Sequence, residues 1–228
     1  MVTTLEQNVE RVFRRIRQAC LRVGRSPDEV MLVAVSKTKP PEQIREAVAA
    51  GLTGFGESRV QEAAQKIEHC PSGLTWHLIG HLQRNKVRPA AALFDMIHSV
   101  DSLPLLRALD AAAGDRGRGL DICLQVNVSG EASKYGVAPA DLVPLATAAA
   151  ACRNLNWRGL MTIPPAVRNP ADARPFFKQL RELRHACYDA TGVTNLGLSM
   201  GMSHDFETAI EEGADWVRVG NAIFGRRP

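Results

Sequence analysis

Lys37 is the residue whose type and position best suit covalent chemistry, because it follows the apolar run 31–35. An apolar run of this length, closed by prolines at 40 and 41, is typical of a buried parallel strand. We expect a strand over residues 31–37, with Lys37 at its carboxyl end, where α/β proteins bind ligands. Partial desolvation there lowers the pKa of an amine and makes it a nucleophile, which suits a Schiff base with an aldehyde. A lysine that merely reaches back to water is the alternative.

Three other lysines are alternative nucleophiles, namely Lys39, Lys86 and Lys134. Lys39 precedes a proline and lies beyond the strand, whereas the other two lie in polar segments. None of the three is expected to be as desolvated as Lys37, which therefore remains the first candidate.

Two loops late in the chain combine small and polar residues in a way that suits a phosphate group. They contain Ser199, Gly201, Ser203, Gly220 and Asn221. In (β/α)₈ barrels the phosphate site often lies in the loops after strands seven and eight, at a helix N-terminus. The glycines permit close approach of the backbone, and we expect Ser203 to cap the helix that follows it. Ordinary turn chemistry is the alternative.

Arg218 lies inside an apolar strand predicted over residues 215–220, where an arginine is costly unless it is paired. Side chains alternate along a strand, so Arg218 lies on the opposite face from the two valines that flank it. If these valines face the helices, the arginine points into the barrel mouth near Lys37. An internal ion pair with a carboxylate such as Glu57 is the alternative.

A metal site is not expected. His77 and His81 have the spacing of a helical zinc pair, but they fall at a strand end and beyond Gly80, and no glutamate follows His77. The five cysteines are widely spaced and form no C-x-x-C motif. This usage excludes a disulfide framework and indicates a reducing compartment, so we expect a cytoplasmic protein.

The elements that must position these residues alternate strictly between strands and helices. Strands are predicted over residues 31–37, 52–57, 74–80, 94–100, 120–128, 157–163, 195–200 and 215–220. The intervening helices are predicted over residues 43–50, 59–68, 103–113, 140–151, 171–190 and 203–212, with a further basic helical segment ending near Arg88. Such alternation requires a parallel sheet, and eight units fit a closed (β/α)₈ TIM-type barrel.

An amphipathic helix precedes the first strand, with Thr3 and Glu6 as a predicted capping box. We expect this extra N-terminal helix to take the place of an eighth outer helix. Residues 1–228 are predicted to form one domain, because no linker or low-complexity stretch divides them. A doubly wound open sheet is the alternative, although no G-x-G-x-x-G follows the first strand.

Composition excludes several classes of protein. The chain of 228 residues is 45% hydrophobic and 23% charged, as expected for a globular protein. No apolar run approaches the ~20 residues of a membrane span. The net charge of +4 slightly favours anionic ligands and does not indicate nucleic acid.

Seven ordered motifs resemble the pyridoxal-phosphate homeostasis family, which is similar in turn to the N-terminal barrel of bacterial alanine racemase. They are VSKTK (35–39), GFGE (54–57), WHLIGHLQ (76–83), QVNVSGE (125–131), GLMTIPP (159–165), LSMGMS (198–203) and VRVG (217–220), and they span nearly the whole chain. Three positions depart from the commonest pattern: Ser58 replaces Asn, Asn221 replaces Thr or Ser, and His204 replaces an acidic residue.

The resemblance implies pyridoxal 5′-phosphate (PLP) as cofactor, bound as an aldimine to Lys37. It further implies the PLP phosphate at Ser199, Gly201, Ser203, Gly220 and Asn221, and Arg218 facing the pyridine nitrogen. The resemblance also implies a function, PLP homeostasis as a carrier or reservoir, with PLP-dependent apoenzymes as possible recipients.

Little or no catalytic turnover is expected, because a guanidinium only donates hydrogen bonds and would leave the pyridine nitrogen unprotonated. A PLP-dependent amino-acid racemase is the alternative, and it needs an acid–base group on each face of the substrate. Racemases of this type take the second group from a C-terminal β domain, which we do not expect after residue 228. A sugar-phosphate isomerase or aldolase is a third hypothesis, and such an enzyme would be colourless. Without the β-domain interface, we expect a monomer.

Overall fold

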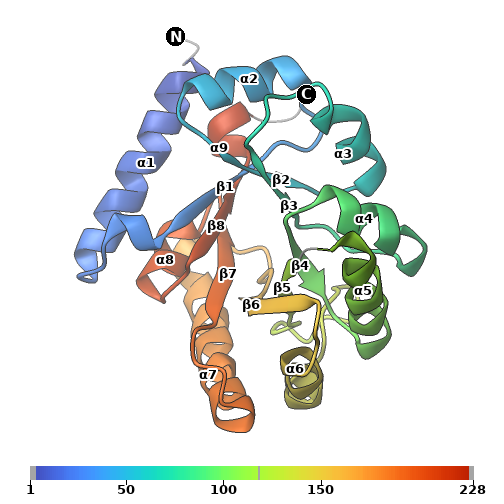
Figure 1. Cartoon of the computed structure of the whole chain (residues 1–228). Helices are drawn as coiled ribbons and strands as arrows, with labels where there is room; N and C mark the ends of the chain where they lie inside the picture. The colour runs from blue at the N-terminus through green and yellow to red at the C-terminus, as the bar shows by residue number, and fades with distance from the viewer. Residues whose placement is uncertain (1–3, 118, 226–228) are drawn as a thin grey trace.

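The computed structural model describes residues 4–117 and 119–225, which form a closed barrel of parallel strands surrounded by helices (Figure 1). The strands are β1 (Met31–Val35), β2 (Gly54–Glu57), β3 (Thr75–Leu78), β4 (Met96–Val100), β5 (Leu120–Gln125), β6 (Leu155–Met161), β7 (Gly197–Met202) and β8 (Trp216–Val219). They are hydrogen-bonded in chain order, and β8 pairs with β1 to close the barrel. The (β/α)₈ prediction is confirmed, and the open doubly wound sheet is excluded.

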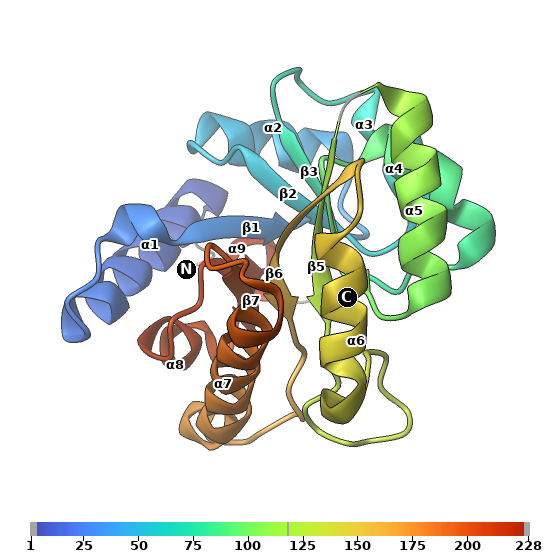
Figure 2. The same cartoon turned by 60° about the horizontal axis from the view of Figure 1, so that its bottom comes forward.

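The helices are α1 (Leu5–Arg22), α2 (Pro41–Ala49), α3 (Val60–Ile67), α4 (Val87–Leu93), α5 (Leu103–Arg116), α6 (Leu142–Ala150), α7 (Arg174–Thr191), α8 (Phe206–Glu211) and α9 (Asn221–Phe224). Figure 2 shows them arranged around the outside of the barrel. Among the described residues, no helix has both the length and the apolar character needed to cross a membrane.

Helix α1 packs against α2, α8 and α9, and therefore fills the place of an eighth outer helix (Figure 1). The side chain of Asn8 donates a hydrogen bond of 2.9 Å to the carbonyl of Ile223, which ties α1 to the end of the chain. The predicted N-cap, Thr3, lies outside the described residues. The observed capping box is formed by Thr4 and Gln7.

The apolar core lies mainly between the barrel and its helices. Val217 and Val219 of β8 belong to this layer, together with buried residues of α1, α7 and α8. Because side chains alternate along a strand, Trp216 and Arg218 point the other way, into the barrel. Trp216 there packs against a separate cluster of Met96, Cys123 and Met161. The interior of the barrel thus contains a small apolar layer and, as shown below, a polar one.

Several predicted strand ends at the mouth of the barrel differ from the observed ones by one to three residues, and two differences bear on the site. Strand β1 ends at Val35 and Lys37 lies in the turn that follows it, because the amide of Lys39 bonds to the carbonyl of Ser36 instead of continuing the ladder. Helix α8 begins at Phe206 and not at Ser203, because β7 runs on to Met202.

Candidate functional site

A cavity of about 440 Å³ opens at the carboxyl ends of the strands. Its lining includes Lys37, Ser58, Ser203, Arg218, Gly220 and Asn221. Strands β1, β7 and β8 and the loops that follow them therefore bring five of the seven predicted cofactor-binding residues to one cavity. A volume in this range suits a small organic ligand, and the carboxyl end of the strands is where barrels of this kind bind their ligands.

Lys37 reaches this cavity from the turn after β1 and is half-buried. The preceding strand is fully buried over Leu32–Ala34, which anchors the turn to the barrel wall. The next residue, Thr38, has φ +66°. This left-handed conformation is disfavoured for a β-branched residue, so the surrounding structure must hold the turn in place.

Arg218 is 3% exposed and is held by two neutral acceptors. Its Nη1 donates to the Ser199 hydroxyl at 2.7 Å, and its Nη2 donates to the Thr162 carbonyl at 2.8 Å. Burial lowers the pKa of the guanidinium to about 10, an effect that Asp205 offsets only in part, so the group is charged at neutral pH. No carboxylate in the described ranges lies within ion-pair distance of it. The predicted alternative, a pair with Glu57, is therefore wrong.

Arg218 stands at one end of a buried hydrogen-bond chain that crosses the barrel. The Ser199 hydroxyl lies 2.8 Å from Nδ1 of His98, and Nε2 of His98 lies 2.9 Å from Nδ1 of His77. At the far end, Nε2 of His77 is buried without a protein partner in the described structure. We name these three residues, Ser199, His98 and His77, the histidine chain.

The guanidinium fixes the direction of the histidine chain. Arginine only donates, so the Ser199 oxygen must accept from it. If Ser199 then donates to His98 and His98 donates to His77, one buried N–H is left unpaired. The reverse direction leaves two buried groups unpaired, the Ser199 O–H and the Nε2 atom of His77. It also points the Nδ1–H of His98 toward the positively charged guanidinium. Since each buried unpaired group costs free energy, the chain runs away from Arg218.

Both histidines are neutral in this arrangement. Burial lowers the pKa of His77 to about 4, and burial together with the neighbouring His77 and Arg218 lowers the pKa of His98 well below its usual value. Each ring then carries its proton on Nε2 and accepts at Nδ1. Arg218 and the histidine chain together therefore contain one positive charge, on Arg218, and neutral partners that orient it.

Ser203 makes contacts that differ from those predicted. Its hydroxyl accepts from the backbone N–H groups of Gly220 at 3.2 Å and Ala222 at 3.4 Å. It does not cap α8, which starts three residues later and has Asp205 at its N-cap position. Ser203 instead links the loop after β7 to the loop after β8 and orients the backbone that faces the cavity.

Two predicted phosphate-binding residues, Ser199 and Gly201, do not line the cavity. Ser199 is fully buried and belongs to the histidine chain. Gly201 has φ +89°, and a Cβ there would lie 2.5 Å from the Cβ of Ala209. This glycine therefore permits the close packing of β7 on α8. Gly220 does line the cavity, and its backbone approaches Val35, where a Cβ would lie 3.2 Å from two atoms.

The two histidines considered as a metal pair lie in different environments. His77 belongs to the histidine chain, whereas the ring of His81 stacks on Tyr135 with centroids 3.8 Å apart. Over the ranges 4–117 and 119–225, no three His, Cys, Asp or Glu side chains are grouped to hold a metal ion.

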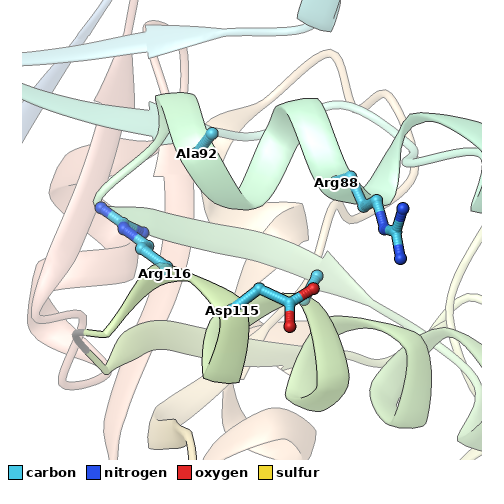
Figure 3. Close-up of a pocket in the computed structure, with 5 residues that line it drawn as sticks. Arg88, Ala92, Asp115 and Arg116 are labelled. Carbon is cyan, nitrogen blue, oxygen red and sulfur yellow. The ribbon is translucent and has the colours of Figure 1, made fainter.

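A second hollow of about 450 Å³ lies outside the barrel, between α4 and α5 (Figure 3). In Figure 3, Arg88 extends away from Arg116, so the two guanidinium groups do not converge. Arg116 is engaged by the Phe94 carbonyl at 2.9 Å, near the amino end of β4. No strand-end residue of the mouth contributes to this hollow. The mouth cavity is therefore the candidate functional site.

Fold and site together define a (β/α)₈ barrel whose mouth holds a cavity lined by the Lys37 and Arg218 side chains. Residues 7–228 match the family model described as alanine racemase, N-terminal domain. The chain is 49% identical to the pyridoxal phosphate homeostasis protein of Pseudomonas aeruginosa, over 99% of this chain and 97% of that protein. It is 45% identical to the protein of the same name from Aquifex aeolicus, over 97% of each chain. The chain therefore belongs to the alanine racemase N-terminal domain family and, within it, to the pyridoxal phosphate homeostasis proteins.

Solved structures agree with this assignment. The structure of PipY from Synechococcus elongatus PCC7942 with PLP bound has a TM-score of 0.82 and 43% identity, covering 92% of this chain and 99% of PipY. Alanine racemase of Clostridium difficile 630 has a TM-score of 0.72 at 13% identity, and this chain covers 57% of it. The second likeness concerns the fold alone.

Proposed function

We propose that the protein binds PLP in the mouth cavity and acts in PLP homeostasis as a carrier or reservoir. The observation that carries the proposal is the convergence of an amine, a charged guanidinium and a serine-linked glycine loop on one cavity of about 440 Å³. Relatives at 45–49% identity are named pyridoxal phosphate homeostasis proteins, and PipY has been solved with PLP. When bound, PLP supplies an aldehyde for covalent attachment and a ring that withdraws electrons.

Each group of the cavity suits one part of PLP. Lys37 would hold PLP covalently, through a C=N bond between its amine and the aldehyde carbon, with the aldehyde oxygen released as water. The loop of Gly220 and Asn221, oriented by Ser203, offers the side-chain donors of Ser203 and Asn221 to the phosphate. Arg218 offers its remaining N–H groups to the pyridine nitrogen. Ser199 and Gly201 support these groups from behind and are not proposed to touch the phosphate.

A guanidinium that faces the pyridine nitrogen explains why turnover should be low. Arg218 can only donate, and its pKa of about 10 keeps it charged at neutral pH. The histidine chain does not deprotonate the guanidinium, because burial lowers the pKa of His77 to about 4 and that of His98 well below its usual value, so neither ring takes up a proton at neutral pH. The nitrogen is therefore held unprotonated, and the ring stabilises a carbanion poorly.

We further propose that a monomer acts in the cytoplasm and releases PLP to apoenzymes that depend on it. All five cysteines are free thiols in the structure, which fits a reducing compartment. A cavity that opens at the mouth of the barrel allows the ligand to enter and leave.

The visible spectrum of the purified protein incubated with PLP, before and after borohydride, tests the proposal. A yellow protein whose absorbance disappears on reduction, with the label mapped to Lys37 by peptide mass spectrometry, is the expected result. A Lys37→Ala variant should lose the band and remain folded. A colourless protein, or a label on Lys39, Lys86 or Lys134, would contradict the assignment.

A second experiment separates a carrier from a racemase. The holoprotein is incubated with L-alanine in deuterated water, and the α-proton is followed by NMR. We expect exchange orders of magnitude below the median enzyme rate of ~10 s⁻¹. Exchange or D-alanine formation near that rate would establish a racemase instead.

A further inference from the structure

A buried ammonium group lies directly beneath the turn that carries Lys37. Lys66 of α3 is 6% exposed, and its Nζ donates three hydrogen bonds. The acceptors are the Ser36 carbonyl at 2.8 Å, a Glu57 carboxylate oxygen at 2.7 Å and a Glu62 carboxylate oxygen at 3.0 Å. An ammonium has three donors, so all of them are used. The group therefore has no donor left for a ligand and serves the protein itself.

The same glutamate that binds Lys66 also holds the other side of the turn. The carboxylate oxygen of Glu62 accepts from the backbone N–H of Thr38. The Ser36 carbonyl belongs to the peptide group before Lys37, and the Thr38 N–H belongs to the peptide group after it. Two side chains one turn apart on α3 thus hold both peptide groups that flank Lys37.

The hydrogen bond to Thr38 constrains the least favourable backbone conformation of the turn. Thr38 is the single non-glycine residue with positive φ among residues 4–117 and 119–225. Such a conformation persists only where neighbouring groups over-determine it. The bond from Thr38 to Glu62 supplies one such constraint, and the turn bond from Lys39 to Ser36 at 3.0 Å supplies another.

We propose that Glu62 and Lys66 are positioning residues that present the amine of Lys37 to the aldehyde carbon of PLP. The inference rests on the proposed function, since it concerns the covalent step at the same lysine. A role in stability alone does not account for the arrangement, because buried ion pairs are on average no more stabilising than apolar residues of similar volume. A role in stability alone also leaves unexplained why Glu62 and Lys66 bond to the two peptide groups on either side of Lys37.

The test separates attachment of the cofactor from recognition of its ring and phosphate. Two probes are titrated: PLP, and pyridoxine 5′-phosphate, which has an alcohol in place of the aldehyde and cannot react with an amine. The variants are Glu62→Ala, which removes the acceptor of the Thr38 N–H, and Glu62→Gln, which keeps an amide oxygen there. Glu182→Ala, at an exposed position on α7, is the matched control.

For Glu62→Ala we expect covalent attachment of PLP to weaken roughly tenfold to hundredfold, the effect of losing a hydrogen bond to a charged group. Affinity for pyridoxine 5′-phosphate should stay within roughly twofold of the unsubstituted protein. Glu62→Gln should recover most of the attachment, and Glu182→Ala should change neither probe. Equal weakening of both probes, or attachment unchanged in Glu62→Ala, would overturn the proposal.

Hydrogen exchange of the Thr38 amide without ligand provides a second readout. We expect slow exchange in the unsubstituted protein and in Glu62→Gln, and fast exchange in Glu62→Ala. Fast exchange in the unsubstituted protein would overturn the positioning role regardless of any cofactor. Slow exchange in a protein that never reacts with PLP would instead leave the geometry intact and refute the proposed function.

Discussion

Two buried cations flank the mouth of the barrel, and they are satisfied in opposite ways. Lys66 is surrounded by two carboxylates and a carbonyl, and all three of its donors are used. Arg218 meets one hydroxyl and one carbonyl, and both are neutral. A guanidinium has five N–H groups, so these two acceptors do not use all the donors of Arg218, whose side chain lines the cavity. Lys66 therefore uses all its donors within the protein, next to the backbone of Lys37, whereas Arg218 can still donate to a ligand.

The difference teaches which buried charge serves structure and which serves binding. A charge neutralised within the protein gains little from an anionic or polar ligand. A buried charge without a carboxylate has lost its hydration without full compensation, so a ligand that accepts its hydrogen bonds gains more than it would in water. The cost of burying Arg218 is thus part of how the site attracts its ligand.

Removing Lys66 should produce the largest effect, because it leaves the fully buried carboxylate of Glu57 without a cation. We expect Lys66→Met to lower the free energy of unfolding by about 3–5 kcal/mol in denaturant titrations. Exposed Lys178 on α7 provides the control, and Lys178→Met should change little. The double variant Lys66→Met, Glu57→Gln should recover part of the loss. A Lys66→Met protein as stable as the control would break the comparison.

The histidine chain on the open side should make stability depend on pH. An unperturbed histidine binds a proton below a pKa of 6.5, whereas folded His77 does so only below about 4. The unfolded state therefore binds more protons in this window, and the contribution of His77 to stability is lost as pH falls from 6.5 to 4. The pKa difference corresponds to about 3 kcal/mol.

Comparison with His77→Gln isolates this contribution. Burial raises the pKa of Glu57 and Asp215, and these carboxyl groups act in the opposite sense as pH falls. The difference in free energy of unfolding between the unsubstituted protein and His77→Gln, measured at several pH values, removes their effect. A difference that is constant across the window would mean that His77 is not held neutral.

Replacing Arg218 should affect ligand binding more than folding, the reverse of the result at Lys66. Arg218→Met leaves two neutral acceptors without a donor but no unpaired charge. We expect PLP affinity to fall roughly tenfold to hundredfold, since a charged hydrogen bond contributes about 1.5–3 kcal/mol. The loss of stability should be smaller than for Lys66→Met. An Arg218→Met protein that unfolds easily and still binds PLP normally would reverse the two roles.

Substitution of Ser203 or Ser199 should have the smallest effects on ligand affinity. Comparing the two variants separates the role of the loop after β8 from the role of the histidine chain. Ser203→Ala releases two backbone N–H groups of the loop after β8, so we expect PLP affinity to fall by about fivefold, the effect of a neutral hydrogen bond. Its stability should change little. Ser199→Ala should instead change the hydrogen bonding of His98, which is visible in the NMR signals of that ring. Its effect on the affinity for inorganic phosphate, a ligand that has only the phosphate, should be weaker than that of Ser203→Ala.

The sequence by itself determined the architecture and the approximate positions of the two main candidate residues, Lys37 and Arg218. Strict alternation of strands and helices is a local signal, readable from periodicity, and it predicted the closed parallel barrel. The alternation in β8 predicted the face of Arg218, and the prolines after β1 predicted that Lys37 would be near a strand end. The family motifs located the loops of Ser203 and Gly220.

Only the tertiary structure decided which side chains meet. Ser199 and His98 are 101 residues apart, and Lys66 and Ser36 are 30 apart, so no local pattern pairs them. The register between β7 and β8 shifts between Ser199 and Met202, in the segment that leads to the loop of Ser203. Contacts across a barrel depend on how its strands are staggered on closure, and this stagger is a property of the whole sheet and not of any segment.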